Sequence, residues 1–180
     1  RESDVYVSLQ DRVDYAVSNN ADLVVGIHNN SATVSSANGA EVIVPRAGEY
    51  HEIGEDLGNL ILDQIEALGL ERRQVYSKDC TTGDHYDDGT LEDYYTMIAG
   101  PREHGTTGII VEHAFVSNGS DASFLKSDAN LKRLGVADAT AIANYYGLSK
   151  HPSLHGFSDV FSYTDHVDDI GWLASTGISE

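Results

Sequence analysis

The sequence predicts an α/β fold in which a mostly parallel, twisted sheet is flanked by helices. Two continuous apolar runs, at 23–27 and 109–111, are typical of strands that are buried on both faces. Segments with apolar residues at helical spacing lie before, between and after these runs. This alternation of helices and buried strands along the chain predicts the α/β class.

The first half of the chain is expected to supply two helices and two strands. Apolar residues at helical spacing predict a helix over about 8–18, before the strand at 21–28. A polar loop separates that strand from a second one at 40–45, which Pro45 closes. The segment 49–70 carries an apolar stripe opposite acidic residues, which predicts a long helix.

The pattern is weaker in the middle of the chain. A short strand is expected at 72–78, and a polar composition predicts a loop at 79–90. A short helix is expected at 91–100. The apolar run 109–111 then predicts a buried strand that ends in Glu112.

Two more helices are expected after that strand. The segment 120–127 begins with Ser120, a residue type that is favoured as an N-cap. The segment 130–148 is rich in alanine, and Gly147 lies where a helix of this kind commonly ends.

A change of composition after Leu148 predicts a domain boundary. We expect one domain over 1–149, a linker at 150–156 and a separate segment at 157–180. Because the sequence starts with Arg1 rather than Met and shows no signal peptide, we expect it to be an internal piece of a longer protein.

Composition restricts the class of partner. The formal net charge is −18 over 180 residues, which argues against nucleic acid as a partner, because binding to phosphates requires a basic surface. The hydrophobic content of 41% is compatible with a packed core, and a single cysteine, Cys80, excludes an intrachain disulfide.

Two chemically active side chains follow buried strands. His28 comes after the run 23–27, and Glu112 comes after the run 109–111. If these strands are parallel neighbours, both side chains converge at the carboxyl edge of the sheet, where α/β proteins place their sites. A neutral imidazole is a good zinc ligand, and a partly desolvated carboxylate has a raised pKa that suits a general base. The pair is therefore consistent with metal-assisted hydrolysis.

A structural interpretation of the same residues stays open at this point. A single histidine after a strand is commonly a hydrogen-bonded structural residue, and a glutamate there is commonly a solvated terminus. The residues and their spacing alone do not decide between the two interpretations.

Two longer stretches carry a resemblance to a known family. The stretch RESDVYVSLQDRVDYAVSNNADLVVGIHNNS, at 1–31, and the stretch GIIVEHAFVSNGSDASFL, at 108–125, occur in this order. They resemble the strand that ends in SIHxN and the later VE.GF.SN..D signature of the zinc-dependent N-acetylmuramoyl-L-alanine amidases of the amidase-3 type. The resemblance runs from Arg1 to about Leu148.

The resemblance implies a reaction and roles for two residues. His28 corresponds to a zinc-binding histidine, and Glu112 corresponds to the catalytic glutamate that activates water and protonates the leaving amine. The implied reaction is hydrolysis of the amide between N-acetylmuramic acid and L-alanine in peptidoglycan, at the extracellular bacterial cell wall. The implied fold lacks the first strand or strands of the family.

The sequence departs from the family at its start. The family takes its other zinc ligands, a histidine in a glycine-rich motif and a glutamate, from a segment that precedes RESD, so we expect them upstream of Arg1. We therefore expect this polypeptide alone to bind Zn²⁺ poorly and to be inactive. Nothing in the motifs favours substitution of the absent ligands by other acidic or histidine side chains, namely His51, Glu52, His85, His104 and His113.

Further residues are candidates for substrate contact. Asn30 could contact substrate, orient His28 or simply cap the strand end. The aromatic and acidic segment 85–95 suits contact with sugar or peptide, which makes Tyr94 and Tyr95 candidates for the substrate groove; a solvated acidic loop is the alternative.

The tail and the function each carry an alternative. The segment 157–180 is similar to the start of an S-layer homology module, which implies anchoring to the cell envelope; a generic linker with a helix is the other interpretation. For the domain, the alternative to a peptidoglycan amidase is an inactive wall-binding or scaffold derivative that lacks a complete zinc site. A zinc carboxypeptidase fits the motifs less well.

Overall fold

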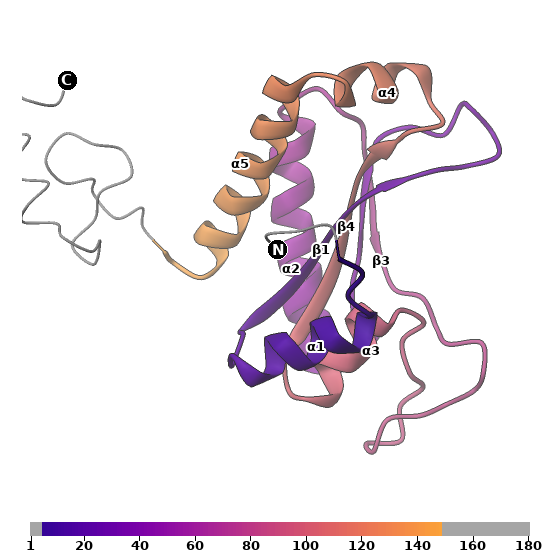
Figure 1. Ribbon diagram of the computed structural model, residues 1–180, viewed down its shortest axis with the longest axis vertical. Coiled ribbons are helices and arrows are strands. Elements are labelled where there is room, and N and C mark those ends of the chain that lie inside the picture. Colours follow the sequence, from indigo (N-terminus) through magenta and orange to yellow (C-terminus); the bar gives the residue numbers. More distant parts are fainter. Residues whose placement is uncertain (1–4, 149–180) are drawn as a thin grey trace, which may run out of the picture. The chain divides into compact units, whose positions relative to one another are not determined.

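The computed structural model describes residues 5–148, which form a mixed α/β fold (Figure 1). The predicted fold class is confirmed. The boundary expected at 150–156 and the segment at 157–180 lie outside the described residues. In chain order the elements are α1 (Leu9–Ser18), β1 (Leu23–Asn30), β2 (Ala40–Ile43), α2 (Gly48–Glu66), β3 (Arg72–Tyr76), α3 (Thr96–Glu103), β4 (Thr107–Phe115), α4 (Gly119–Leu125) and α5 (Asp128–Tyr145).

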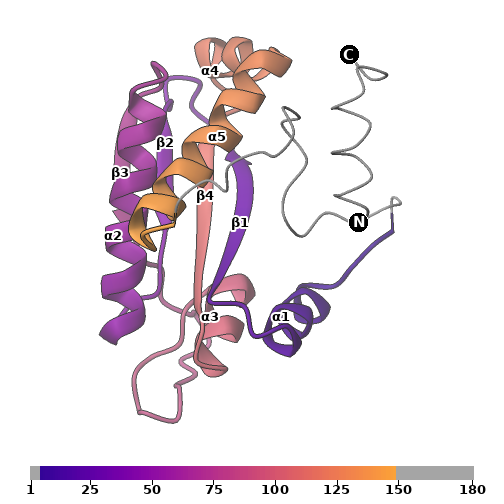
Figure 2. The same ribbon diagram turned by 90° about the vertical axis from the view of Figure 1, so that its left-hand side faces the viewer.

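The strands of this part of the chain form one sheet in the order β1-β4-β2-β3. The pairs β1–β4 and β2–β3 are parallel, and the central pair β2–β4 is antiparallel. Helices α2 and α5 lie together along one face of the sheet (Figures 1 and 2). Helices α1 and α3 lie near the end where β4 begins, and α4 lies near the end where β4 finishes (Figure 2).

The core divides between the two faces of the sheet, as strand alternation requires. Ile109 and Val111 of β4 pack into a large apolar cluster with α2 and α5, whereas Ile110 packs into a small cluster with Ile43 and Ile98. The small cluster lies beside α3. Among the helices of residues 5–148, none lies over the carboxyl end of this face (Figure 2).

The strands run further than the sequence predicted. His28 and Glu112 do not terminate their strands, because β1 continues to Asn30 and β4 continues to Phe115. The apolar run marks only the part of each strand that is buried on both faces. Backbone pairing continues beyond it, since Asn30 and Phe115 are still partners in the ladder.

Two helix starts also differ from the expectation. The helix expected at 91–100 is α3, which begins at Thr96, because the residues before it pair with the preceding loop through the bridges Asp79–Asp93 and His85–Leu91. The cap of α4 is Asn118 rather than Ser120: its side chain accepts hydrogen bonds from the backbone N–H groups of Ser120 and Asp121.

Within residues 5–148, no helix combines the length and the apolar character needed to cross a membrane.

Candidate active site

Three polar side chains lie in one row across the sheet. His28 on β1 is in register with Glu112 on β4, and Glu112 is in register with Glu41 on β2. Residues in direct register on neighbouring strands project from the same face of a sheet. The parallel pairing of β1 and β4 thus brings His28 and Glu112 together, as expected, and adds Glu41, which the sequence analysis missed.

Glu112 is a half-buried carboxylate in a poorly solvated position. Its Oε2 atom is buried and has no hydrogen-bond partner among the described residues. Burial, and secondly the negative charge of Glu41, raise the pKa of the Glu112 carboxyl above its ordinary value, while His113 acts in the opposite direction. A carboxylate of this kind binds a proton readily, which suits a general acid–base role.

Glu41 is held on both oxygen atoms. It is 5% exposed, and its Oε1 accepts a hydrogen bond from Asn30 Nδ2 at 2.7 Å. Its Oε2 accepts a hydrogen bond from Arg73 Nε at 2.9 Å. In the sequence, Glu41 is only a charged residue within an otherwise apolar predicted strand, and its burial and its partners appear with the fold.

Tyr76 is a second residue that the sequence analysis missed. Burial raises the pKa of its phenol well above the ordinary value, and the neighbouring Glu41, Tyr95 and Glu112 add to this effect. Tyr76 therefore remains a protonated hydrogen-bond donor next to the two carboxylates.

The structure also places the candidate aromatic residues. Tyr95 packs with Tyr76 against the small apolar cluster on the face that carries Glu112. Tyr94 is 45% exposed, and the Lys78 ammonium lies 3.7 Å from the centre of its ring, so one ring face is already covered. Contact of Tyr94 and Tyr95 with substrate stays a prediction.

Of the other described histidines, all but His85 have hydrogen-bond partners for their side chains within the protein. His113 points to the face opposite Glu112, as expected from strand alternation, and is buried against Asp138 of α5 at 2.9 Å. His51 Nδ1 and His104 Nδ1 lie within hydrogen-bond distance of backbone carbonyl groups. Over residues 5–148, no group of three or more His, Cys, Asp or Glu side chains is arranged to hold a metal ion.

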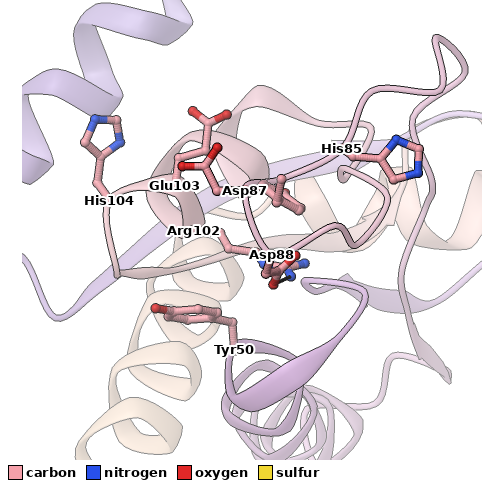
Figure 3. Close-up of a pocket in the computed structure, with 8 residues that line it drawn as sticks. Tyr50, His85, Asp87, Asp88, Arg102, Glu103 and His104 are labelled. Carbon is pink, nitrogen blue, oxygen red and sulfur yellow. Dashed lines mark hydrogen bonds and ion pairs between the residues drawn. The ribbon is translucent and has the colours of Figure 1, made fainter.

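A separate cavity of about 440 Å³ lies between α2, α3 and the loop before α3 (Figure 3). None of His28, Glu41 and Glu112 lines it. His85 and His104 stand at opposite sides of it, which argues against a shared metal ion (Figure 3). The lining residues are Tyr50, His85, Tyr86, Asp87, Asp88, Arg102, Glu103 and His104.

Asp121 fixes the chain at the carboxyl end of β4. Its buried Oδ2 accepts hydrogen bonds from the backbone N–H groups of Phe115 and Gly39, both at 2.8 Å. The end of β4 is thereby tied to the residue that precedes β2. This link fixes β4, which carries Glu112, relative to β2, which carries Glu41.

Comparison with known families gives one match over most of the chain. Residues 1–144 match the family described as N-acetylmuramoyl-L-alanine amidase, Amidase_3. Among curated proteins, the chain is 28% identical over 148 residues to the N-acetylmuramoyl-L-alanine amidase LytC of Bacillus subtilis (strain 168). The alignment covers 81% of this chain and 26% of LytC, so the chain spans about a quarter of that relative's length.

Solved structures share the fold at low identity. Cwp6 from Clostridium difficile superposes with a TM-score of 0.65 at 24% identity, over 81% of this chain and 21% of that one. The catalytic domain of the amidase CwlV from Bacillus (Paenibacillus) polymyxa gives 0.63 at 21% identity, over 83% and 71%. The amidase AmiC2 of Nostoc punctiforme gives 0.59 at 24% identity, over 82% and 70%.

Proposed function

Because the family match spans residues 1–144, this chain belongs to the N-acetylmuramoyl-L-alanine amidase family, Amidase_3, and we propose that it is the catalytic part of a peptidoglycan hydrolase. The substrate bond is the amide between N-acetylmuramic acid and L-alanine of the stem peptide. The observation that carries this proposal is the pairing of Glu112, with its unpartnered buried oxygen, and His28 in one row at the open end of the sheet.

Zn²⁺ is the proposed cofactor. The side chains present can be compared with the ligands that zinc prefers. His28 has an exposed side chain on an edge strand and offers an imidazole nitrogen of the kind that zinc prefers. Glu112, its partner in register, offers a carboxylate that no described residue fully satisfies. These two residues fit one metal ligand and one general base. When bound, zinc supplies polarisation of the scissile carbonyl and lowers the pKa of water.

The further zinc ligands are proposed to come from residues that precede Arg1. A catalytic zinc ion normally takes three protein ligands, and the described residues contain no group of three suitable side chains. Strand β1 lies at the edge of the described sheet, and no strand of residues 5–148 pairs with its outer side. A segment seated there would lie next to His28.

Glu112 performs the proton transfers in the proposed reaction. It takes a proton from the attacking water as the new C–O bond forms, and it delivers a proton to the nitrogen of L-alanine as the C–N bond breaks. The products are the free lactyl carboxyl group and a new L-alanine amino terminus. Tyr76 and the fixed Glu41 border this carboxylate and shape its surroundings.

The location and the anchor follow from this substrate. Peptidoglycan lies outside the cytoplasmic membrane, so the proposed location is the extracellular cell wall. The segment 157–180, with its resemblance to an S-layer homology module, is proposed as a contact with the cell envelope. Tyr94 and Tyr95 are the aromatic candidates for contact with the substrate.

Digestion of purified peptidoglycan tests the proposed activity. The full-length protein with Zn²⁺ should release new L-alanine amino termini, and Glu112→Gln should reduce their release by about 10³-fold or more. Glu66→Gln, at the exposed end of α2, is the matched control and should retain activity. Release of other termini would overturn the bond assignment. Sedimentation with peptidoglycan without any release would favour the inactive wall-binding derivative.

A further inference from the structure

A chain of side-chain contacts crosses the sheet at the end that carries His28 and Glu112. Asn30 on β1 donates to Glu41 on β2, and Glu41 accepts from Arg73 on β3. Strand β4 lies between β1 and β2, so the bond between Asn30 and Glu41 passes above β4 beside Glu112. We call Asn30, Glu41 and Arg73 the polar strap.

We propose that Asn30 and Glu41 are positioning residues, which fix β1 relative to β2 and thereby hold His28 at the correct spacing from Glu112. This inference rests on the proposed function for the meaning of that spacing. The contacts of the strap join described residues only, so its effect on the position of β1 does not depend on the proposed function.

The strap lies next to an irregularity in the backbone ladder. The register between β1 and β4 shifts between His28 and Asn30, which marks a bulge or irregularity. Bulges disrupt the local ladder and re-aim side chains, and they are common beside active sites. Since β1 pairs only with β4 in the described sheet, a side-chain bond to β2 adds a constraint that the ladder does not give.

Glu41 is a fixed anchor for this constraint. Arg73 Nε lies 2.9 Å from its Oε2, and Arg73 also donates to the carbonyl oxygen of Asn38 at 3.3 Å. The guanidinium lies 4.9 Å from the ring centre of Phe115 at the end of β4. Arg73 is thus held by three neighbours, and it holds Glu41 in turn.

The contacts of Asn30 favour positioning over substrate contact. Its Nδ2 donates to Glu41, and its Oδ1 accepts from the backbone N–H of Ser31 at 2.7 Å. Both polar atoms of the amide are therefore engaged within the protein. Each atom retains one further hydrogen-bonding position, but the two internal bonds already fix the orientation of the amide toward Glu41.

An exchange of hydrogen-bonding groups tests the strap. Asn30→Asp places a second carboxylate against Glu41 and breaks the bond by repulsion. Adding Glu41→Gln restores it, because the Gln Nε2 can donate to the new Asp while its Oε1 still accepts from Arg73. Asn30→Ala removes the donor without adding charge. Asn29→Asp, the exposed neighbour on the opposite side of β1, controls for the added charge.

The kinetic readout uses the full-length protein on peptidoglycan fragments. Asn30→Asp and Asn30→Ala should lower kcat by about 10–100-fold with KM within about threefold, because a misplaced reacting group costs rate rather than binding. The double variant should recover kcat to within about fivefold of the parent, and Asn29→Asp should keep it. A raised KM with unchanged kcat, or a double variant no better than Asn30→Asp, would overturn the proposal.

A second readout needs no activity. In the 180-residue chain, the backbone amides of β1 near His28 that point toward β4 should exchange faster with solvent in Asn30→Asp and Asn30→Ala, and regain protection in the double variant, at equal global stability measured in urea. Unchanged exchange in all variants would contradict the strap even in an active enzyme. A parent that releases no L-alanine termini would sink the proposed function, while this exchange test would still decide on the strap.

Discussion

Glu112 is a carboxylate that the fold keeps partly away from water and next to a second carboxylate. Burial is the larger cause of its raised pKa, and the charge of Glu41 is the smaller one. The charged form is thus less favourable in the folded chain than in the unfolded chain, which makes this residue a source of instability. A site that needs a proton-binding carboxylate accepts such a cost.

Replacing Glu112 by Gln should therefore stabilise the chain while it removes activity. We expect the free energy of unfolding to rise by about 0.5–1 kcal/mol at pH 7, a modest value because the side chain is half exposed and screened by solvent. Since the folded pKa is the higher one, the destabilising cost is fully present above it. The cost falls as pH decreases through the folded pKa, so the gain should vanish near pH 4.

Urea unfolding of the parent and Glu112→Gln at pH 7 and pH 4 measures this difference. Glu66→Gln, at the exposed end of α2, should show no comparable gain at either pH. A Glu112→Gln variant that is less stable than the parent at pH 7 would show that the carboxylate makes favourable contacts, contrary to this account.

Asp121 has the opposite character, since its carboxylate is fully used by the fold. It accepts hydrogen bonds from two backbone N–H groups, those of Gly39 and Phe115. Asp121→Ala leaves both without this partner and should lower the free energy of unfolding by about 2–4 kcal/mol. Asp121→Asn keeps one oxygen atom that can accept both bonds and should lose about half as much or less. Equal losses in the two variants, measured in urea, would contradict this role.

At the level of single residues, the sequence indicated the two proposed site residues but not the side chains around them. His28 and Glu112 follow apolar runs, so their position is visible in the sequence. Glu41 and Tyr76 are visible only after β2 is placed between β3 and β4, because their partners are distant in sequence. Strand order is a property of long-range pairing, which no local pattern encodes.

At the scale of helices and loops, the loop before α3 is joined to that helix by one buried cation, the guanidinium of Arg102. Arg102 of α3 is 7% exposed, and its guanidinium contacts Thr90 at 2.7 Å, Asp88 at 3.2 Å and Asp93 at 3.5 Å. It also lies 4.0 Å from the ring centre of Tyr86. These contacts join the loop to the helix that supports the small apolar cluster.

Removing that cation should destabilise the chain strongly. Arg102→Ala leaves the buried Asp93 carboxylate without its cation and should cost about 3–5 kcal/mol. Adding Asp93→Asn should recover part of this loss, because no buried charge then remains. Arg133→Ala, on the exposed side of α5, should change stability by less than about 0.5 kcal/mol. Urea unfolding compares the three, and a small loss in Arg102→Ala would show that the loop is held by other contacts.

Substitutions at two glycines compare the effect of close packing with the effect of helix propensity. A Cβ atom at Gly108 of β4 would collide with the backbone of Met97 and Ile98 in α3, so Gly108→Ala should cost about 1–3 kcal/mol. Gly135 lies in the middle of α5 with open space around it, so Gly135→Ala should add about 0.5–1 kcal/mol. Thermal or urea unfolding of both variants checks the signs, and a stabilised Gly108→Ala would refute the close approach of β4 and α3.

The boundaries of the elements were predictable only where a local signal sets them. Helix α5 ends at Tyr145, just before Gly147, which adopts a positive φ of 63° and lies where the sequence indicated a helix end. The start of α3 is set instead by bridges between the segment before it and residues 79–85. Strand β4 likewise runs past Glu112 to Phe115, because pairing with its partner strands determines its length.

At the scale of the whole molecule, the fold class was predictable from the sequence, whereas the proposed metal site depends on which strands become neighbours. The alternation of apolar runs with amphipathic helices is enough to predict an α/β sheet, and the parallel pairing of β1 with β4 then brings His28 and Glu112 into register. A catalytic zinc ion normally takes three protein ligands. Over residues 5–148, no group of three His, Cys, Asp or Glu side chains is arranged to hold a metal ion. We therefore expect the 180-residue chain to bind Zn²⁺ weakly.

Calorimetric titration with Zn²⁺ tests this expectation directly. A saturable site would stabilise the fold according to its affinity, so 0.1 mM Zn²⁺ should change the free energy of unfolding by less than about 1 kcal/mol. His28→Ala should differ little from the parent in this chain but should abolish zinc binding in the full-length protein. Tight one-to-one binding by the 180 residues that His28→Ala removes would show that His28 already has its partner ligands here. The proposal that the other ligands precede Arg1 would then be wrong, while the role of His28 itself would be strengthened.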